Sequence, residues 1–179
     1  MLESLKQLSD VMEKSRQRKI PIITDAKAAF LLDLVKKKKP AKILELGTAN
    51  GVSATVLTAA GGAIVTIDSD EKTQQEAFEL FDRFQVDARV ITGDGIEALE
   101  ELVLTDAESF DFIFIDFMKR KYLEALPFCL KLAKKGAIIV ADNVTNEKCA
   151  DFLKEIQQNK KVTTTLVEID DAMTISEVK

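Results

Sequence analysis

The sequence predicts an α/β fold with a mostly parallel sheet and helices on both faces, and three observations support this. Short β-branched and aromatic runs alternate with amphipathic stretches from residue 42 onward. Several runs are apolar without interruption, as strands buried on both faces require. The last two runs, Val162–Ile169 and Met173–Val178, are separated by a segment too short for a crossover helix. They should pair as an antiparallel hairpin at the sheet edge.

The individual elements follow from the local patterns. Residues 1–20 are expected to form one helix ahead of the core. A second helix is indicated by an apolar stripe comprising Ala29, Phe30, Leu32 and Val35. The run Lys36–Lys39 after it is interpreted as a solvated helix end, where cations complement the helix dipole. The predicted parallel strands are Ile43–Leu46, Ala63–Ile67, Ala88–Ile91, Phe110–Ile115 and Ala137–Ala141. Helices are expected between them near residues 52–60, 70–85, 95–103, 119–134 and 146–159.

Composition restricts the class of protein. The chain has 179 residues, of which 46% are hydrophobic, so residues 1–179 are expected to form one domain. The net charge of −5 disfavours a globally basic nucleic-acid binder. There is no histidine, which excludes an imidazole base, Ser-His and Cys-His dyads and His-ligated zinc within this chain.

Cysteine usage and hydropathy predict the compartment. Cys129 and Cys149 form no C-x-x-C and are interpreted as buried free thiols in a reducing cytosol. No stretch resembles a signal peptide or a membrane span. The protein is therefore expected to be soluble and cytoplasmic, with no membrane partner.

Polar residues follow every predicted parallel strand, where open α/β sheets bind ligands. Gly47 and Gly51 flank the turn after the first strand; glycines there suit either ligand binding or a tight turn. Their spacing is not that of G-x-G-x-x-G, which disfavours a dinucleotide site and hydride transfer. Asp68, after the second strand, is placed either to accept ribose hydroxyls or, like Ser69, to cap the next helix.

Three oxygen-bearing side chains follow the fourth and fifth strands. Asp116, Asp142 and Asn143 form a set suited to Mg²⁺ or another hard divalent cation, although the last two could instead cap a helix. Lys119-Arg120-Lys121 places cations where a helix should begin, which is the wrong sign for the dipole and suggests a function. Lys119 is a candidate general base; the alternative is that it pairs with surface acids.

Together these residues resemble the class I S-adenosylmethionine (SAM)-dependent methyltransferases, specifically the divalent-metal-dependent O-methyltransferases of the catechol and caffeoyl-CoA type. The segment Asp116–Tyr122 matches the family's D-x-x-K-x-x-Y, and Ala141-Asp142-Asn143 matches its A-D-N. Thr24–Lys27 also resembles the family's segment before the first strand. The match runs over roughly residues 20–178. It implies a three-layer, Rossmann-like, seven-stranded sheet with an antiparallel C-terminal hairpin.

The resemblance also implies roles for individual residues. Those expected around the methionine end of SAM are Glu45, Gly47, Thr48, Gly51 and Ser53, with Ser53 near its carboxylate. Asp68 is expected at the ribose, and Asp94 with Gly95 at the adenine. Asp116, Asp142 and Asn143 match the ligands of the divalent cation, for which Mg²⁺ is expected, and Asp116 borders SAM as well. Lys119 matches the general base, so that Lys119 and Asp116 form the catalytic pair.

Departures from the family pattern concern the acceptor. Ala49 stands where many methyltransferases have glycine, and Val52 replaces a frequent aromatic residue. The chain is shorter than usual for the family and has no Trp and one Tyr. An open acceptor site, or one completed by a second subunit, is therefore expected, and with it a homodimer.

Two alternatives to a small-molecule hydroxyl acceptor stay open. The first is a modified tRNA nucleoside, whose phosphates Lys119–Lys121 and the basic residues 1–42 would contact. Against it, residues 43–179 carry a net charge of −11. The second is a SAM- or nucleotide-binding module without catalysis, which the intact Asp116, Lys119, Asp142 and Asn143 set disfavours.

Overall fold

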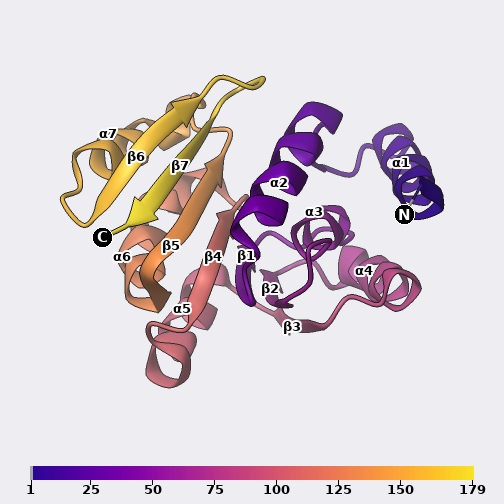
Figure 1. Ribbon diagram of the computed structural model, residues 1–179, viewed down its shortest axis with the longest axis horizontal. Coiled ribbons are helices and arrows are strands. Elements are labelled where there is room, and N and C mark those ends of the chain that lie inside the picture. Colours follow the sequence, from indigo (N-terminus) through magenta and orange to yellow (C-terminus); the bar gives the residue numbers. More distant parts are fainter. Residues whose placement is uncertain (1) are drawn as a thin grey trace.

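A seven-stranded sheet forms the centre of the protein in the computed structural model, which describes residues 2–179 (Figure 1). The strands are β1 (Lys42–Leu46), β2 (Ala63–Asp68), β3 (Ala88–Thr92), β4 (Phe110–Ile115), β5 (Ala133–Asp142), β6 (Val162–Val167) and β7 (Met173–Val178). Their order is β3-β2-β1-β4-β5-β7-β6. The first five are parallel, and β7 pairs antiparallel with both β5 and β6. The predicted fold class and the C-terminal hairpin are confirmed.

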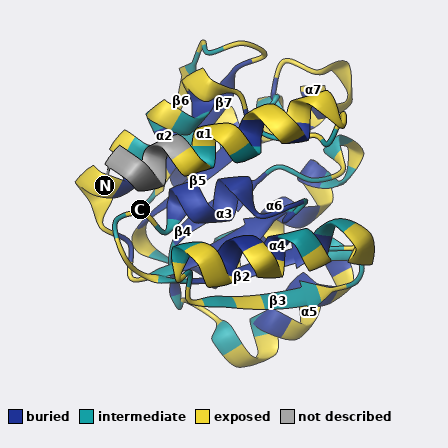
Figure 2. Cartoon of the chain, turned by 90° about the vertical axis from the view of Figure 1, so that its right-hand side faces the viewer, coloured by how far each residue is buried: buried dark blue, intermediate teal, exposed yellow. Residues whose placement is uncertain are grey.

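Helices cover both faces of the sheet. They are α1 (Leu2–Gln17), α2 (Asp25–Lys38), α3 (Val52–Leu57), α4 (Glu71–Phe84), α5 (Gly95–Asp106), α6 (Tyr122–Leu132) and α7 (Ala150–Gln158), with 3-10 turns η1 (Lys119–Lys121) and η2 (Glu147–Cys149). Side chains of α1 to α4 pack in one hydrophobic cluster with one face of the sheet, and those of α5 to α7 pack against the other. Figure 2 shows α3 buried along its whole length between more exposed helices.

Several predicted boundaries were wrong for local reasons. The helix predicted over 119–134 ends at Leu132, because β5 begins at Ala133, where the chain pairs with β4 across a register shift. The helix expected from residue 146 begins at Ala150, since Asn146 caps the short turn η2 instead. Strand β6 stops at Val167, before a turn in which Asp170 and Ala172 have positive φ. Of the N-terminal helix predicted over 1–20, residues 2–17 are helical, and Met1 lies outside the described residues.

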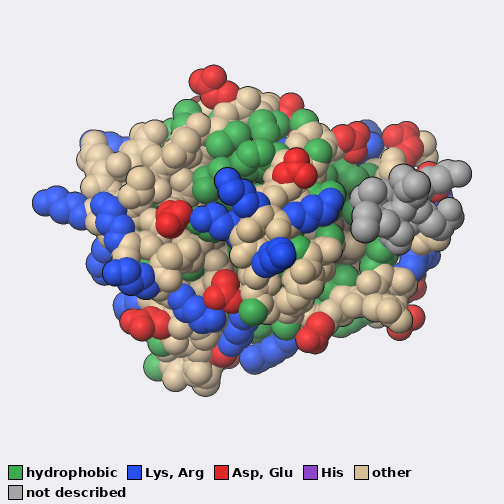
Figure 3. All heavy atoms as spheres, in the orientation of Figure 1, with side chains coloured by type: hydrophobic (Ala, Val, Ile, Leu, Met, Phe, Trp, Pro, Cys, Tyr) green, Lys and Arg blue, Asp and Glu red, His purple; other side chains and the backbone are tan. Residues whose placement is uncertain are grey.

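The stripe that helix α2 presents to the core was predicted in part. Val35 is buried and Phe30 and Leu32 pack against the core, as expected, while Ala29 is exposed. The prediction missed Lys27 and Leu31, which are buried on the same face. The run Lys36–Lys39 is exposed, as expected for a solvated helix end, and basic side chains gather over α2 on the face shown in Figure 3.

Two further sequence expectations can be compared with the structure. Cys129 and Cys149 are free and buried, as predicted. Within residues 2–179, no helix combines the length and the apolar character needed to cross a membrane.

Candidate functional site

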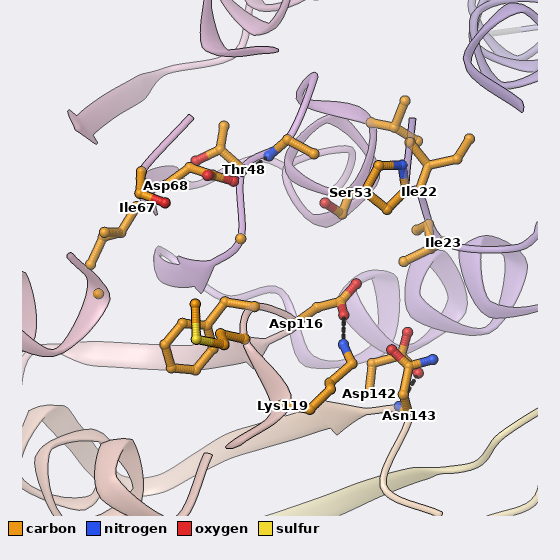
Figure 4. Close-up of a pocket in the computed structure, with 18 of the residues that line it drawn as sticks. Ile22, Ile23, Thr48, Ser53, Ile67, Asp68, Asp116, Lys119, Asp142 and Asn143 are labelled. Carbon is orange, nitrogen blue, oxygen red and sulfur yellow. Dashed lines mark hydrogen bonds and ion pairs between the residues drawn. The ribbon is translucent and has the colours of Figure 1, made fainter. Parts of the chain in front are cut away.

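A cavity of about 580 Å³ opens at the carboxyl ends of the parallel strands (Figure 4). The predicted site residues that line it are Gly47, Thr48, Ser53, Asp68, Asp94, Gly95, Asp116, Lys119, Asp142 and Asn143. Glu45 and Gly51 are buried and are not among the lining residues. The segment before α2 closes one side with Pro21, Ile22 and Ile23. The volume is typical of a small-molecule site.

The loop after β1 is held against its neighbours by backbone packing. Gly47 has φ +106, and a Cβ there would lie 2.1 Å from the carbonyl oxygen of Asp116. A Cβ on Gly51, with φ +85, would lie 2.8 Å from the Phe81 ring. Both glycines are therefore required by the tight turn itself, whatever binds in front of it.

Asp68 fixes the same loop from β2. Its Oδ2 accepts a hydrogen bond from the Ala49 amide at 2.8 Å, and its Oδ1 accepts one from the Asp70 amide at 3.0 Å. The N-cap of α4 is Asp70, so neither Asp68 nor Ser69 caps that helix as the alternative supposed. Asp68 remains at the cavity wall, where a ribose was expected.

Glu45 is fully buried beneath the loop. Its Oε2 accepts a hydrogen bond from Thr66 at 2.5 Å, while its Oε1 has no hydrogen-bond partner. Burial raises the pKa of Glu45 to about 8, against the opposing effect of the Ser53 and Thr66 hydroxyls. Glu45 is therefore mostly protonated at neutral pH.

Asp94 and Gly95 open α5 at the third strand end. Asp94 caps the helix through the Ile96 amide at 2.8 Å and pairs with Lys121 Nζ at 2.5 Å. The hydrogen bond from Lys121 lowers the pKa of Asp94. A Cβ on Gly95 would lie 2.9 Å from the Phe117 ring, so the glycine makes room for an aromatic wall that the sequence analysis missed.

Lys119 is held at the cavity by two side chains. Its Nζ lies 2.6 Å from Asp116 Oδ1 and donates to the Tyr122 hydroxyl at 3.0 Å. Burial raises the pKa of Tyr122 well above its ordinary value, so the phenol stays neutral. The wrong-signed cations at this helix start are explained by acids that follow two of the strands, Asp116 after β4 for Lys119 and Asp94 after β3 for Lys121.

Asp142 and Asn143 meet a buried lysine from α2. Lys27 Nζ lies 2.6 Å from Asp142 Oδ1 and 2.6 Å from Asp171 Oδ1, with its side chain 3% exposed. Asn143, with φ 56, donates its Nδ2 to Asp171 Oδ2 at 2.7 Å. Burial, followed by the charge of Asp116, raises the pKa of Asp142 to about 6.

Lys27 and Asp171 were given no role by the sequence analysis. Two local signals point to Lys27: the resemblance of Thr24–Lys27 to the family's segment before the first strand, and its position four residues before Leu31 on the inward stripe of α2. Asp171 carries no such signal, because it reaches the site only through the fold of the β6–β7 turn.

Comparison with known proteins assigns the family. A sequence profile of the O-methyltransferase family matches residues 2–178. The chain belongs to this family. The resemblance recognised from the two motifs is thereby confirmed.

Individual relatives agree with this assignment. A catechol O-methyltransferase of Niastella koreensis is 37% identical over 123 residues, covering 66% of this chain and 56% of that protein. A caffeoyl-CoA O-methyltransferase of Stellaria longipes is 31% identical, covering 62% and 48%. The chain thus spans about half the length of these curated relatives. The crystal structure of an O-methyltransferase from Bacillus cereus in complex with SAH has a TM-score of 0.88 at 26% identity, covering 97% of this chain and 91% of that one.

The family raises the question whether this member's residues suit a divalent cation. Within residues 2–179, no three Asp, Glu, Cys or His side chains gather as a metal site, so Asn143 is needed as third donor. The Asn143 amide nitrogen is engaged by Asp171, which leaves its carbonyl oxygen as the donor. Asp116 lies close enough to Asp142 for its charge to raise the pKa of Asp142. Two neighbouring carboxylates and one amide oxygen fit a hard cation.

Proposed function

We propose that this O-methyltransferase family member transfers the methyl group of SAM to a hydroxyl of a small-molecule acceptor, assisted by a divalent cation. The observation that carries the proposal is the convergence of Asp116, Lys119, Asp142 and Asn143 in one cavity with the β1 loop and Asp68. The names of the relatives, catechol and caffeoyl-CoA O-methyltransferase, support a hydroxyl acceptor.

The residues proposed for SAM lie along one wall of the cavity. Thr48 and Ser53 lie on the β1 loop side, Asp68 follows β2, and Asp94 with Gly95 begins α5. Asp68 accepts two backbone amides, which fixes its carboxylate for ribose hydroxyls. Phe117 offers a flat apolar surface beside Gly95 for the adenine.

The residues proposed for the cation are Asp116, Asp142 and Asn143, with Mg²⁺ the expected ion. When bound, the cation supplies positive charge that favours an ionised acceptor hydroxyl. Lys119 is the group proposed to accept the hydroxyl proton at Nζ, and Asp116 and Tyr122 hold that nitrogen in place. Positioning the acceptor oxygen about 3 Å from the methyl group removes the entropic cost of a collision. The products are a methyl ether and S-adenosylhomocysteine.

The proposal also covers the part of the cavity that would hold the acceptor and the oligomeric state of the protein. Apolar side chains of Ile22, Ile23 and Met118 line the cavity, and Met118 is 46% exposed. This exposure supports a second subunit as the missing wall, hence a homodimer, which light scattering would test.

The two buried free thiols, Cys129 and Cys149, support a reducing, cytoplasmic location.

The test of function uses methyl-labelled SAM with two acceptor pools, a catechol and a total RNA fraction, each with Mg²⁺ or with chelator. We expect label in the catechol, lost with chelator and in Asp142→Asn, and retained in the surface control Asp82→Asn. Label confined to RNA would overturn the small-molecule acceptor, and label in its tRNA fraction would establish the tRNA alternative. SAM binding with no transfer to any acceptor from fractionated cell extract would establish a non-catalytic module.

A further inference from the structure

Lys27 is a buried cation at the proposed metal site, and we propose that its ammonium competes with the divalent ion for Asp142 and lowers the site's metal affinity. This inference rests on the proposed function. Lys27 comes from the first turn of α2 and reaches the cavity wall with its side chain 3% exposed. Its Nζ lies 2.6 Å from Asp142 Oδ1, which also accepts the Asn143 amide at 2.7 Å, so the ammonium neutralises the carboxylate that would hold the cation.

A charged side chain at the position of Lys27 costs free energy that an aliphatic side chain would not. It lies in the first turn of a helix, where the dipole disfavours a cation, and it is removed from water. The sequence offers aliphatic residues at the following positions of the same stripe, Leu31 and Val35. A lysine here keeps its charge because two carboxylates, those of Asp142 and Asp171, contact its ammonium.

The charges around the proposed ligands show how the competition works. Three carboxylates, those of Asp116, Asp142 and Asp171, face two ammonium groups, those of Lys27 and Lys119. The group therefore carries one net negative charge, and a divalent ion would reverse its sign. Without Lys27 the group would carry two negative charges, which a divalent ion neutralises.

Asp171 gives the Lys27 ammonium a second carboxylate partner. Its Oδ1 contacts Lys27, and its Oδ2 accepts from Asn143 Nδ2 at 2.7 Å. When the ion takes Asp142, Lys27 keeps Asp171 as its partner and need not leave the cavity wall. Lys27 thus forms an ion pair with Asp142 when the ion is absent, and pairs with Asp171 alone when the ion binds to Asp142.

The experiment measures Mn²⁺ binding to the full chain by the EPR signal of free Mn²⁺, which does not depend on methyl transfer. The variants are Lys27→Met, close in size but uncharged, and Lys36→Met as a control on the exposed end of the same helix. We expect Lys27→Met to bind Mn²⁺ at least about tenfold more tightly than the natural protein. Lys36→Met should leave the Kd unchanged.

The outcomes separate this inference from the proposed function. Equal Mn²⁺ affinities in the natural protein and Lys27→Met would overturn the role of Lys27 and leave the metal assignment intact. No Mn²⁺ binding by any variant would overturn the metal assignment and this inference together. If Lys27→Met does not fold, the comparison is made with Lys27→Gln, whose uncharged amide can still donate a hydrogen bond to a carboxylate at this position. Lys27→Gln must then bind Mn²⁺ more tightly than the natural protein, and an equal Kd would overturn the role of Lys27.

Discussion

Replacing the buried Glu45 with glutamine should remove a loss of folding stability that grows as pH rises. Glu45 is fully buried, and its Oε1 has no hydrogen-bond partner. Glutamine has nearly the same shape and carries no charge at any pH. Its oxygen can accept the Thr66 hydroxyl that Glu45 Oε2 accepts at 2.5 Å.

The magnitude follows from the pKa of Glu45, about 8 in the folded protein against an ordinary value of 4.5. Between these values the unfolded chain releases a proton that the folded protein retains, so stability falls as pH rises. The fall is about 1.4 kcal/mol per pH unit and approaches about 5 kcal/mol above pH 8. Below about pH 4.5 both states are protonated and the loss is absent.

The assay is urea unfolding followed by circular dichroism at intervals from pH 5 to 8.5, without SAM. The difference in unfolding free energy between Glu45→Gln and the natural protein should grow with pH at about 1.4 kcal/mol per unit. The control Glu79→Gln removes the same charge from an exposed position on α4 and should keep the natural slope. A difference that stays constant with pH would refute the assignment of a protonated Glu45.

Three further changes test the cavity. Lys119→Met should lower kcat by about 100-fold or more while leaving the Kd for SAM nearly unchanged. A loss of SAM affinity as large as the loss of kcat would contradict a base role. Asp68→Ala should raise the Kd for SAM at least about tenfold in calorimetry, since it removes the ribose partner and frees the Ala49 amide. Gly47→Ala should destabilise the fold by about 2 kcal/mol or more in urea unfolding, because its Cβ would meet the Asp116 carbonyl; an unchanged midpoint would contradict this packing.

The fold was largely predictable because its signals are local. Uninterrupted apolar runs such as Phe112–Ile115 mark strands buried on both faces, and the short link at 170–172 forces a hairpin. The boundary errors occurred where side chains redirect the backbone, as at Asn146, or where a strand starts directly after a helix, as at Ala133.

The site was predictable where strand ends and motifs mark it. Asp116, Lys119, Asp142 and Asn143 lie together because adjacent parallel strands end at one edge of the sheet. Lys27 and Asp171 escaped prediction, because their contacts join residues 144 positions apart and depend on how α2 and the β6–β7 turn dock. Glu45 was expected around the methionine end of SAM, and that role stays a prediction; the sequence does not show that its side chain is fully buried and outside the cavity lining, which depends on the fold.

The pairing of acids and lysines in the cavity bears on how a ligand lies there. Four lining acids have lysine partners: Asp94 with Lys121, Asp116 with Lys119, and Asp142 and Asp171 with Lys27. Among the described contacts, Asp68 is held by backbone amides and by no lysine. The end of β2 therefore offers a carboxylate that no lysine contacts, and the two hydroxyl donors of a neutral ribose would suit it. If SAM binds with its ribose at Asp68, as we propose, the sulfonium bonded to that ribose would lie in the same cavity as Asp116, Lys119, Asp142 and Asn143, the residues proposed to hold the cation and the acceptor.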